Sequence, residues 1–163
     1  MLPQDLLEHP LAIAIESWDP AAIVDGRLDR GETTLVIEPG KIGAVCEHLK
    51  SRHHFLRLSG VTAVDRHPME PRFEVVYHLH SIERNERLRL KCLLPGQSPE
   101  IGSVTTVYPT ADWYEREVYD LFGVTFLGHP DLRRLMLPDG YEGHPLRKDF
   151  PTHGYKYSYQ DQG

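Results

Sequence analysis

The stretch FEVVYHLHSIERNERLRLKCLL, residues 73–94, decides the fold. Its first half places apolar residues at every second position, namely Phe73, Val75, Tyr77 and Leu79. Its second half repeats this spacing with Leu88, Leu90, Cys92 and Leu94. Strict alternation predicts strands with one buried face and one face in water, which suits an antiparallel sheet. The polar residues 83–86 predict a turn that joins the two strands into a hairpin.

Two stretches nearer the N-terminus predict a second hairpin. Residues 21–28 and 33–37 flank the turn-like cluster Asp29-Arg30-Gly31-Glu32. Residues 6–15 are apolar enough for a helix, but Pro10 interrupts this run, so only a short helix is expected there.

The spacing of apolar residues changes to that of a helix after Pro39. One face carries Ile42, Val45, Cys46 and Leu49, at positions i, i+3, i+4 and i+7. Residues 54–65 then predict a strand with an irregularity at Gly60. The summed order is helix, two strands, helix, three strands, helix and irregular tail. This order predicts a two-layer α+β fold, with a mixed or mainly antiparallel sheet covered on one face by helices.

Length and charge narrow the class of protein. The chain has 163 residues, enough for one domain, and its net charge is −6. An acidic chain argues against nucleic acid or an anionic membrane surface as the main ligand. No window approaches the about 20 apolar residues of a membrane span. The N-terminus lacks the features of a signal peptide, so we expect a cytoplasmic protein that reaches membranes only through a partner.

The two cysteines predict no metal centre. Cys46 and Cys92 lie far apart in the sequence, in segments that read as core. An iron–sulfur cluster needs about four thiolates, and structural zinc needs about four Cys or His ligands. We therefore expect both cysteines to be buried apolar residues.

Residues 112–122 predict a short amphipathic helix. Asp112 is the expected N-cap, with Glu115 three residues on, and Gly123 supplies the stop. The apolar stripe consists of Tyr114, Val118, Leu121 and Phe122. Glu117 and Asp120 flank this stripe. They are either solvated, or they pair with Arg133, Arg134 or Arg147 and hold the following chain against the helix.

The chain after this helix has almost no periodic pattern. Pro and Gly occupy seven of the 24 positions from 128 to 151. Such a segment forms neither a helix nor a central strand, so contacts with something else must hold it extended. We therefore expect a domain at residues 1–127, followed by a partner-docking segment and tail at 128–163. The alternating Tyr155, Tyr157 and Tyr159 of the tail are expected to dock along a neighbouring chain.

Other side chains suggest alternatives of another class. His129 and His144, each in a Gly-His-Pro unit, are candidate metal ligands of a small metal-dependent enzyme. Glu117 and Asp120 are weak candidates for acid–base catalysis, since nearby arginines keep carboxylates ionised. His78 and His80 are expected on a solvent-facing strand rather than at a metal. A basic row on a strand, Arg87, Arg89 and Lys91, lacks the aromatics of a nucleic-acid site.

The C-terminal third also resembles a known family. The matching motifs are Glu115-Arg116-Glu117, Asp120-Leu121-Phe122-Gly123, Gly128-His129-Pro130, Leu132-Arg133-Arg134 and Gly143-His144-Pro145-Leu146-Arg147-Lys148-Asp149-Phe150-Pro151. They resemble the 30-kDa subunit family, also called the C subunit, of respiratory complex I, the proton-translocating NADH:quinone oxidoreductase. The motifs run from about Ser103 to Pro151, while the first hundred residues resemble the family only in their pattern of elements.

The resemblance implies a structural subunit of the peripheral arm. Such a protein carries no cofactor and is not catalytic by itself, although the complex uses NAD, FMN, iron–sulfur clusters and quinone. The implied partners are chiefly the D subunit, which lines the quinone cavity, then the B and I subunits and other peripheral-arm subunits, on the cytoplasmic side of the membrane. An equivalent component of a membrane-bound hydrogenase or a related quinone- or ferredoxin-linked complex is the nearest alternative. The implied interface comprises Glu115, Arg116, Glu117, Asp120, His129, Arg133, Arg134, His144, Arg147, Lys148 and Asp149.

Overall fold

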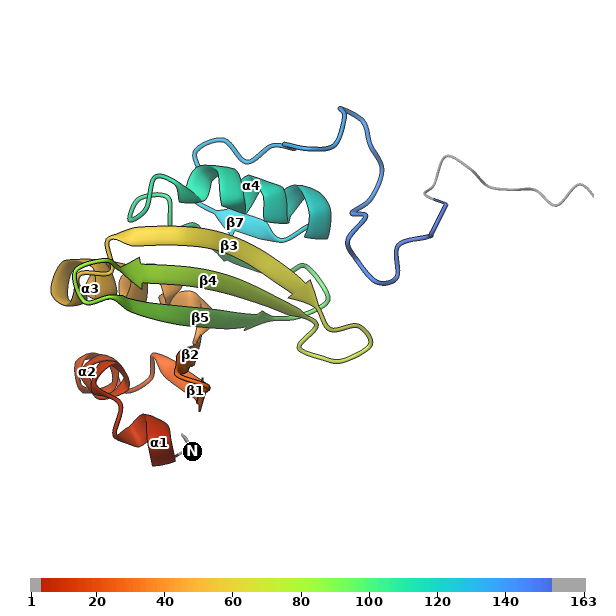
Figure 1. The fold of residues 1–163 in the computed structure, drawn as a ribbon. Helices are drawn as coiled ribbons and strands as arrows, with labels where there is room; N and C mark the ends of the chain where they lie inside the picture. The colour runs from red at the N-terminus through yellow and green to blue at the C-terminus, as the bar shows by residue number, and fades with distance from the viewer. Residues whose placement is uncertain (1–3, 154–163) are drawn as a thin grey trace, which may run out of the picture.

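A five-stranded mixed sheet forms the centre of the computed structural model, which describes residues 4–153 (Figure 1). Its strand order is β1-β2-β5-β4-β3. The strands are β1 Ile23–Asp29, β2 Glu32–Ile37, β3 Arg57–Asp65, β4 Phe73–Ser81 and β5 Glu86–Leu94. All neighbouring pairs are antiparallel except β2 and β5, which are parallel. The expected α+β fold with a mixed, mainly antiparallel sheet is confirmed.

The central hairpin follows the alternation in the sequence. The apolar members of β4 and β5 are buried on one face, which we call the inner face. Their polar neighbours lie on the opposite, outer face. The sheet therefore separates an apolar core from a polar surface, as period-two patterning predicts. The irregularity expected at Gly60 is also present, as a shift of register between Leu58 and Gly60.

The N-terminal hairpin is confirmed as well, with Arg30 and Gly31 at its turn, both at positive φ. The helix expected before it is split in two: α1 Gln4–Leu7 and α2 Pro10–Trp18. Pro10 does not end a helix here but begins α2. Proline is tolerated there because the N–H groups of the first turn have no partner within the helix.

Helix α3, Ile42–His53, follows a short 3-10 turn, η1, at Pro39–Lys41. It lies behind the sheet in Figure 1. Its four predicted apolar residues are all buried there, from Ile42 to Leu49. Cys46 and Cys92 are both buried as predicted, and burial raises the pKa of both thiols.

A second, two-stranded sheet holds α4, Ala111–Phe122, in place. It pairs β6 Glu100–Gly102 with β7 Thr125–Leu127 in parallel, and α4 lies between them in sequence. Helix α4 packs beside β3, at the edge of the main sheet (Figure 1). The sequence did not predict β6 and β7, since three residues are too few to show a period. Within residues 4–153 the longest helices have 12 residues, and none qualifies as a membrane span.

Residues 128–153, called here the C-terminal segment, form neither helix nor strand. They run past α4 and then toward the loop between β3 and β4 (Figure 1). Leu132 packs against the hydrophobic core. The tyrosines that we expect to dock on a neighbour, Tyr155, Tyr157 and Tyr159, lie outside the described residues.

Candidate functional site

Asp120 attaches the C-terminal segment to α4 and lies at the centre of the candidate site. Its side chain is fully buried on α4. One oxygen, Oδ2, accepts the backbone N–H groups of Leu135, Met136 and Leu137, at 3.1, 2.8 and 2.9 Å. The other, Oδ1, accepts Arg134 Nη1 at 2.8 Å. Burial alone would raise the pKa of Asp120, but these hydrogen bonds outweigh it and lower the pKa, so the carboxylate stays ionised.

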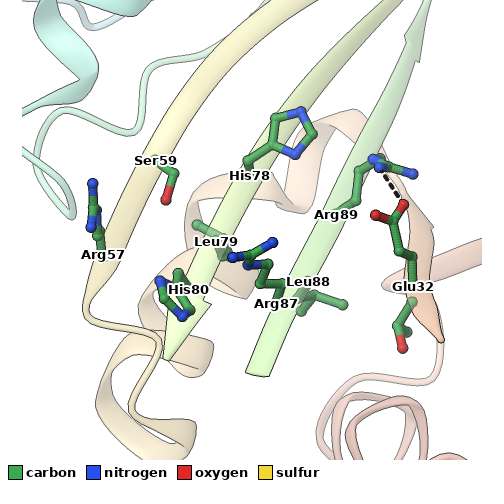
Figure 2. A pocket seen from close by; sticks show the side chains of 10 residues that line it. Glu32, Arg57, Ser59, His78, Leu79, His80, Arg87, Leu88 and Arg89 are labelled. Atoms are coloured by element: carbon green, nitrogen blue, oxygen red, sulfur yellow. Dashed lines mark hydrogen bonds and ion pairs between the residues drawn. The ribbon is translucent and has the colours of Figure 1, made fainter. Parts of the chain in front are cut away.

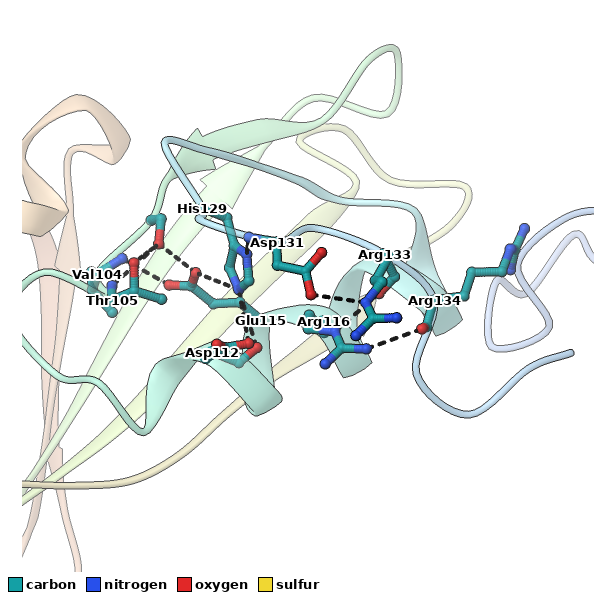
Figure 3. Close-up of polar contacts among 10 residues, drawn as sticks. Val104, Thr105, Asp112, Glu115, Arg116, His129, Asp131, Arg133 and Arg134 are labelled. Atoms are coloured by element: carbon teal, nitrogen blue, oxygen red, sulfur yellow. Dashed lines mark hydrogen bonds and ion pairs between the residues drawn. The ribbon is translucent and has the colours of Figure 1, made fainter. Parts of the chain in front are cut away.

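Two arginines, one on α4 and one on the segment, add further hydrogen bonds to this attachment. Arg116 of α4 donates from Nε and Nη2 to the backbone oxygens of Arg133 and Arg134, both at 3.2 Å (Figure 3). Arg134 in turn reaches the carbonyl of Gly143, also at 3.2 Å. The guanidinium of Arg116 also lies over the ring of Trp113, 5.1 Å from its centroid. A planar fork with several donors suits this role, because it binds two oxygens at fixed positions.

The end of α4 is capped by the C-terminal segment. Gly123 has φ of 73°, the left-handed cap that the sequence predicts. The last carbonyls of the helix find partners in the segment: Arg147 Nε donates to Phe122 O at 2.6 Å, and the amide of Leu146 donates to Leu121 O at 3.1 Å. His144 Nδ1 lies 2.9 Å from Asp120 O. Burial lowers the pKa of His144, which favours the neutral ring.

The start of α4 is built differently from the prediction. Thr110, not Asp112, is the N-cap, because a turn at Tyr108 already brings Ala111 into the helix. Glu115 does not close a capping box. It is fully buried and accepts the amide of Val104 at 2.8 Å and the hydroxyl of Ser103 at 2.6 Å (Figure 3). Burial raises the pKa of Glu115, despite these two hydrogen bonds.

His129 fastens the beginning of the segment beside Glu115. Its Nδ1 accepts the amide of Asp131 at 3.0 Å, so Nε2 carries a ring hydrogen. This Nε2 donates to the backbone oxygen of Asp112 at 3.1 Å and lies 3.9 Å from a carboxylate oxygen of Glu115 (Figure 3). The histidine side chain is completely buried.

A cluster around Asp65 fixes the far end of the segment. Asp65, at the end of β3, is buried and accepts Arg72 Nε at 2.9 Å and the amide of Lys148 at 2.8 Å. Arg72 also bridges to Asp149, with Nη2 at 2.6 Å from Oδ1. The hydrogen bond from Arg72 is the main cause that lowers the pKa of both carboxyl groups. Sequence reasoning missed Asp65 and Arg72, since their partners in the segment lie about half the chain away.

The predicted interface residues thus divide into sets by burial. Four of them are buried within the chain itself: Glu115, Arg116, Asp120 and the side chain of His129. Four others are exposed: Glu117, Arg133, Lys148 and Asp149. The remaining three, Arg134, His144 and Arg147, are partly buried against α4. The expected pairing of Asp120 with Arg134 is confirmed, whereas Arg133 pairs with Asp131 and Arg147 binds helix carbonyls. Contact with a partner stays a prediction for all eleven.

The alternative sites find little support in this geometry. The ring of His129 contacts the first turn of α4, and the ring of His144 contacts its last turn. The two histidines therefore do not share a site. Residues 4–153 contain no group of three or more His, Cys, Asp or Glu side chains arranged to hold a metal. Both oxygens of Asp120 are occupied by hydrogen-bond donors, which leaves it poorly suited to transfer protons.

Comparisons with known proteins address the family of the chain. Residues 35–156 match the family described as respiratory-chain NADH dehydrogenase, 30 Kd subunit, a longer match than the motifs alone indicate. A relative from Cereibacter sphaeroides, named as the C subunit of NADH-quinone oxidoreductase, is 45% identical over 157 residues, 94% of this chain and 76% of the relative.

Two solved structures are similar to the chain. The first is a trypsin-resistant fragment of Nqo5, with a TM-score of 0.65 and 29% identity over 75% of this chain and 98% of the fragment. The second is a chain of a membrane-bound sulfane sulfur reductase, an archaeal respiratory membrane complex. It has a TM-score of 0.77 and 30% identity, and covers 94% of this chain and 92% of that one. The family match spans the central hairpin, α4 and the C-terminal segment, so the chain belongs to the 30 Kd subunit family of respiratory-chain NADH dehydrogenase, that of the C subunit of NADH-quinone oxidoreductase.

Proposed function

We propose that this chain is a structural subunit, without a redox centre, of the peripheral arm of a proton-translocating NADH:quinone oxidoreductase. It packs against the D subunit, which lines the quinone cavity and is called here the quinone-cavity subunit, through α4 and the C-terminal segment. The observation that carries the proposal is an extended segment held in shape by buried charges while two of its apolar side chains, Met136 and Leu146, face outward. The B and I subunits and other peripheral-arm subunits are the further partners, and the complex holds the chain at the cytoplasmic side of the membrane.

The outward side chains supply the contact area. Trp113 on α4 is 61% exposed, and Met136 and Leu146 on the segment are 64% and 51% exposed. Aromatic residues, Met and Arg are enriched in protein interfaces, and large side chains near the centre of an interface carry most of the binding energy. The exposed charges Arg133, Lys148 and Asp149 suit the polar rim of such an interface.

The buried network gives the surface its shape before a partner binds. Glu115, Arg116, Asp120 and His129 contact the chain's own backbone, so we assign them a positioning role rather than direct contact with the quinone-cavity subunit. A segment fixed in advance loses less conformational entropy on binding than a disordered one, and this raises affinity.

The absence of a redox role is proposed from the cysteines. Metal centres bind cysteine as the thiolate. Burial raises the pKa of both Cys46 and Cys92, so each stays a protonated thiol in the core. Two such thiols supply neither the number nor the charge of ligands that an iron–sulfur cluster requires.

The nearest alternative is an equivalent component of a complex with another electron donor. The structural likeness to a chain of the archaeal sulfane sulfur reductase supports this alternative. Sequence identity favours the NADH-linked complex, since it is 45% to the relative from Cereibacter sphaeroides and 30% to the archaeal chain.

The test replaces the three outward apolar side chains. Trp113→Ala, Met136→Ala and Leu146→Ala together should abolish co-migration of this chain with the quinone-cavity subunit on native gels and reduce NADH:quinone activity of the membranes. The melting temperature of the isolated chain should change little, because exposed side chains contribute little to its stability. A matched control carries Leu7→Ala, Ile13→Ala and Val24→Ala, which are similarly exposed at 49%, 47% and 52% but lie on α1, α2 and β1. Normal assembly of the first triple variant would refute the proposal.

A further inference from the structure

The outer face of the sheet carries a hollow that the proposed docking surface does not use. Its volume is about 510 Å³. Its lining includes Arg57, Ser59, His78, His80, Arg87 and Arg89. Figure 2 shows these side chains on three neighbouring strands, β3, β4 and β5. Arg57, Ser59 and Arg87 are exposed to solvent.

The strand register arranges the basic side chains in rows. Arg57 lies opposite His80, and His80 lies opposite Arg87, so one row crosses three strands. In the next row His78 lies opposite Arg89. Neighbouring strands are about 4.8 Å apart, which places the backbones of Arg57 and Arg87 roughly 10 Å from each other. Two arginines therefore flank one histidine on an open surface.

Some basic side chains of this face form ion pairs with a carboxylate, and others do not. Arg89 pairs with Glu32 at 2.7 Å, and Lys91 pairs with Glu74 at 2.8 Å. In the part of the chain that the structure describes, no carboxylate lies within ion-pair distance of Arg57 or Arg87. The charges of these two exposed arginines are therefore available to an anionic partner.

His78 adds a neutral hydrogen-bonding group to the hollow. His78 is half-buried, and burial, followed by the nearby Arg89, lowers its pKa. Near neutral pH its ring is therefore uncharged. The arginines supply positive charge to the hollow, and they stay ionised at every physiological pH.

We propose that the outer face binds an acidic segment of another protein of the complex, whose carboxylates pair with Arg57 and Arg87. This inference rests on the proposed assembly, but it concerns a different face of the chain. The sign of the charge selects the partner's chemistry, because this face is basic on a chain whose net charge is −6. The open shape and the distance between the arginines favour several carboxylates spread along a polypeptide over one enclosed small anion.

The experiment places a photo-reactive amino acid at Ser59 in the full chain, assembled into the complex in native membranes. Mass spectrometry of the cross-linked peptide is expected to identify a segment rich in Asp and Glu. The double variant Arg57→Glu and Arg87→Glu should lower the cross-link yield about tenfold, because each reversal replaces attraction by repulsion. Arg57→Lys with Arg87→Lys should keep most of it.

Two controls separate the possible causes of a loss. Arg52→Glu reverses an exposed charge on α3, which lies behind the sheet and away from the hollow (Figure 1), and should leave the yield unchanged. A second photo-reactive probe at Met136 reports on the α4 surface, so failure of the proposed docking to the quinone-cavity subunit is seen separately. Thermal melting of each variant shows whether it is folded.

Several results would overturn the inference. One is an assembled complex, with cross-links from Met136, in which the probe at Ser59 finds no polypeptide. Another is a cross-linked segment without acidic residues. The third is saturable binding of inorganic phosphate to the isolated chain, abolished by the glutamate double variant, with no cross-linked peptide. That outcome would assign the hollow to a small anion instead.

Discussion

Asp120 and Glu115 occupy the same helix, are equally buried, and yet are opposite in their electrostatics. Three backbone amides and one guanidinium donate to the carboxylate of Asp120, and its pKa is lowered. Glu115 receives one amide and one hydroxyl, and its pKa is raised by burial. The number and charge of donors thus decide whether a buried carboxylate stabilises the fold in its ionised form.

Substitution of Asp120 tests the attachment of the segment. In Asp120→Asn one oxygen becomes an NH₂ group, which faces either three N–H groups or a guanidinium, so hydrogen bonds are lost either way. We expect the full chain to lose about 3 kcal/mol of unfolding free energy in urea titrations. Hydrogen exchange at the amides of residues 135–137 should accelerate.

The control for this substitution is Asp131→Asn. Asp131 forms an exposed ion pair with Arg133 within the same segment, and such a pair contributes about 1 kcal/mol at most. Equal losses of stability in the two variants would show that Asp120 does not attach the segment.

The titration of Glu115 predicts a pH dependence with a definite sign. A carboxyl group whose pKa is raised on folding binds its proton more tightly in the folded state, so its contribution to stability falls as pH rises above the unfolded value, about 4.3. Glu115→Gln removes this contribution while its oxygen can still accept the amide of Val104. The free energy of unfolding of the variant, relative to the original chain, should therefore increase from pH 4 to pH 7.

Glu117→Gln is the matched control, since Glu117 lies on the same helix but is exposed. It measures the effect of replacing a solvent-exposed carboxyl group of α4 under the same conditions. A stability of Glu115→Gln, relative to the original chain, that decreases from pH 4 to pH 7 would mean that the ionised form of Glu115 is the stabilised one.

At the scale of the elements, the end of α4 joins helix and segment into one unit. Gly123 is required there twice: its φ is positive, and an added Cβ would lie 2.5 Å from His144 Cδ2 and 2.6 Å from Arg147 Nη2. Left-handed backbone costs a non-glycine residue roughly 1–2 kcal/mol. Displacement of the two side chains, which cap the helix carbonyls, adds a further cost of about 1 kcal/mol.

Gly123→Ala should therefore destabilise the full chain more than Gly31→Ala does, in urea unfolding of both variants. Gly31 also has positive φ, 78°, but nothing lies within 4 Å of its added Cβ. The difference between the two variants isolates the contact with His144 and Arg147. Equal destabilisation would mean that the segment adapts to the methyl group without cost.

Sequence patterns predicted the elements whose side chains repeat and missed those that depend on distant contacts. Hairpins, α3 and the stop at Gly123 follow from local periodicity and backbone preference. The strands β6 and β7 have three residues each, and their pairing joins Glu100 to Thr125, a contact that local spacing does not reveal. The N-cap moved from Asp112 to Thr110, because the turn at Tyr108 and the burial of Glu115 are tertiary effects.

The sequence predicted which residues belong to the candidate site better than it predicted what each of them does. The motifs identified Asp120, Arg134 and Arg147, and the structure joins all three to α4 or the segment. Spacing along the chain does not show which side chains turn inward, so buried and exposed members were grouped as one interface. The sequence did not indicate Asp65 and Arg72 as site residues, because the segment contacts them only in the folded chain.

At the scale of the whole molecule, the sheet gives the chain two separate surfaces. Its edge at β3 supports α4 and the outward apolar residues, while its outer face presents a basic row from β3 to β5. A protein with one apolar and one charged surface is able to contact two neighbours at once. The proposed partners therefore do not compete for the same residues.

The long-range hydrogen bonds of Asp65 and Asp120 also set an order of events during translation. The ribosome delivers these aspartates well before their donors at residues 134–137 and 148. Until those residues emerge, the carboxylate of Asp120 stays in water, and that of Asp65 has only its donors nearby in sequence, Arg72 and the amide of His67. Synthesis that stops early thus yields a product with an unfinished side, which quality-control proteases can recognise before it meets the rest of the respiratory machinery.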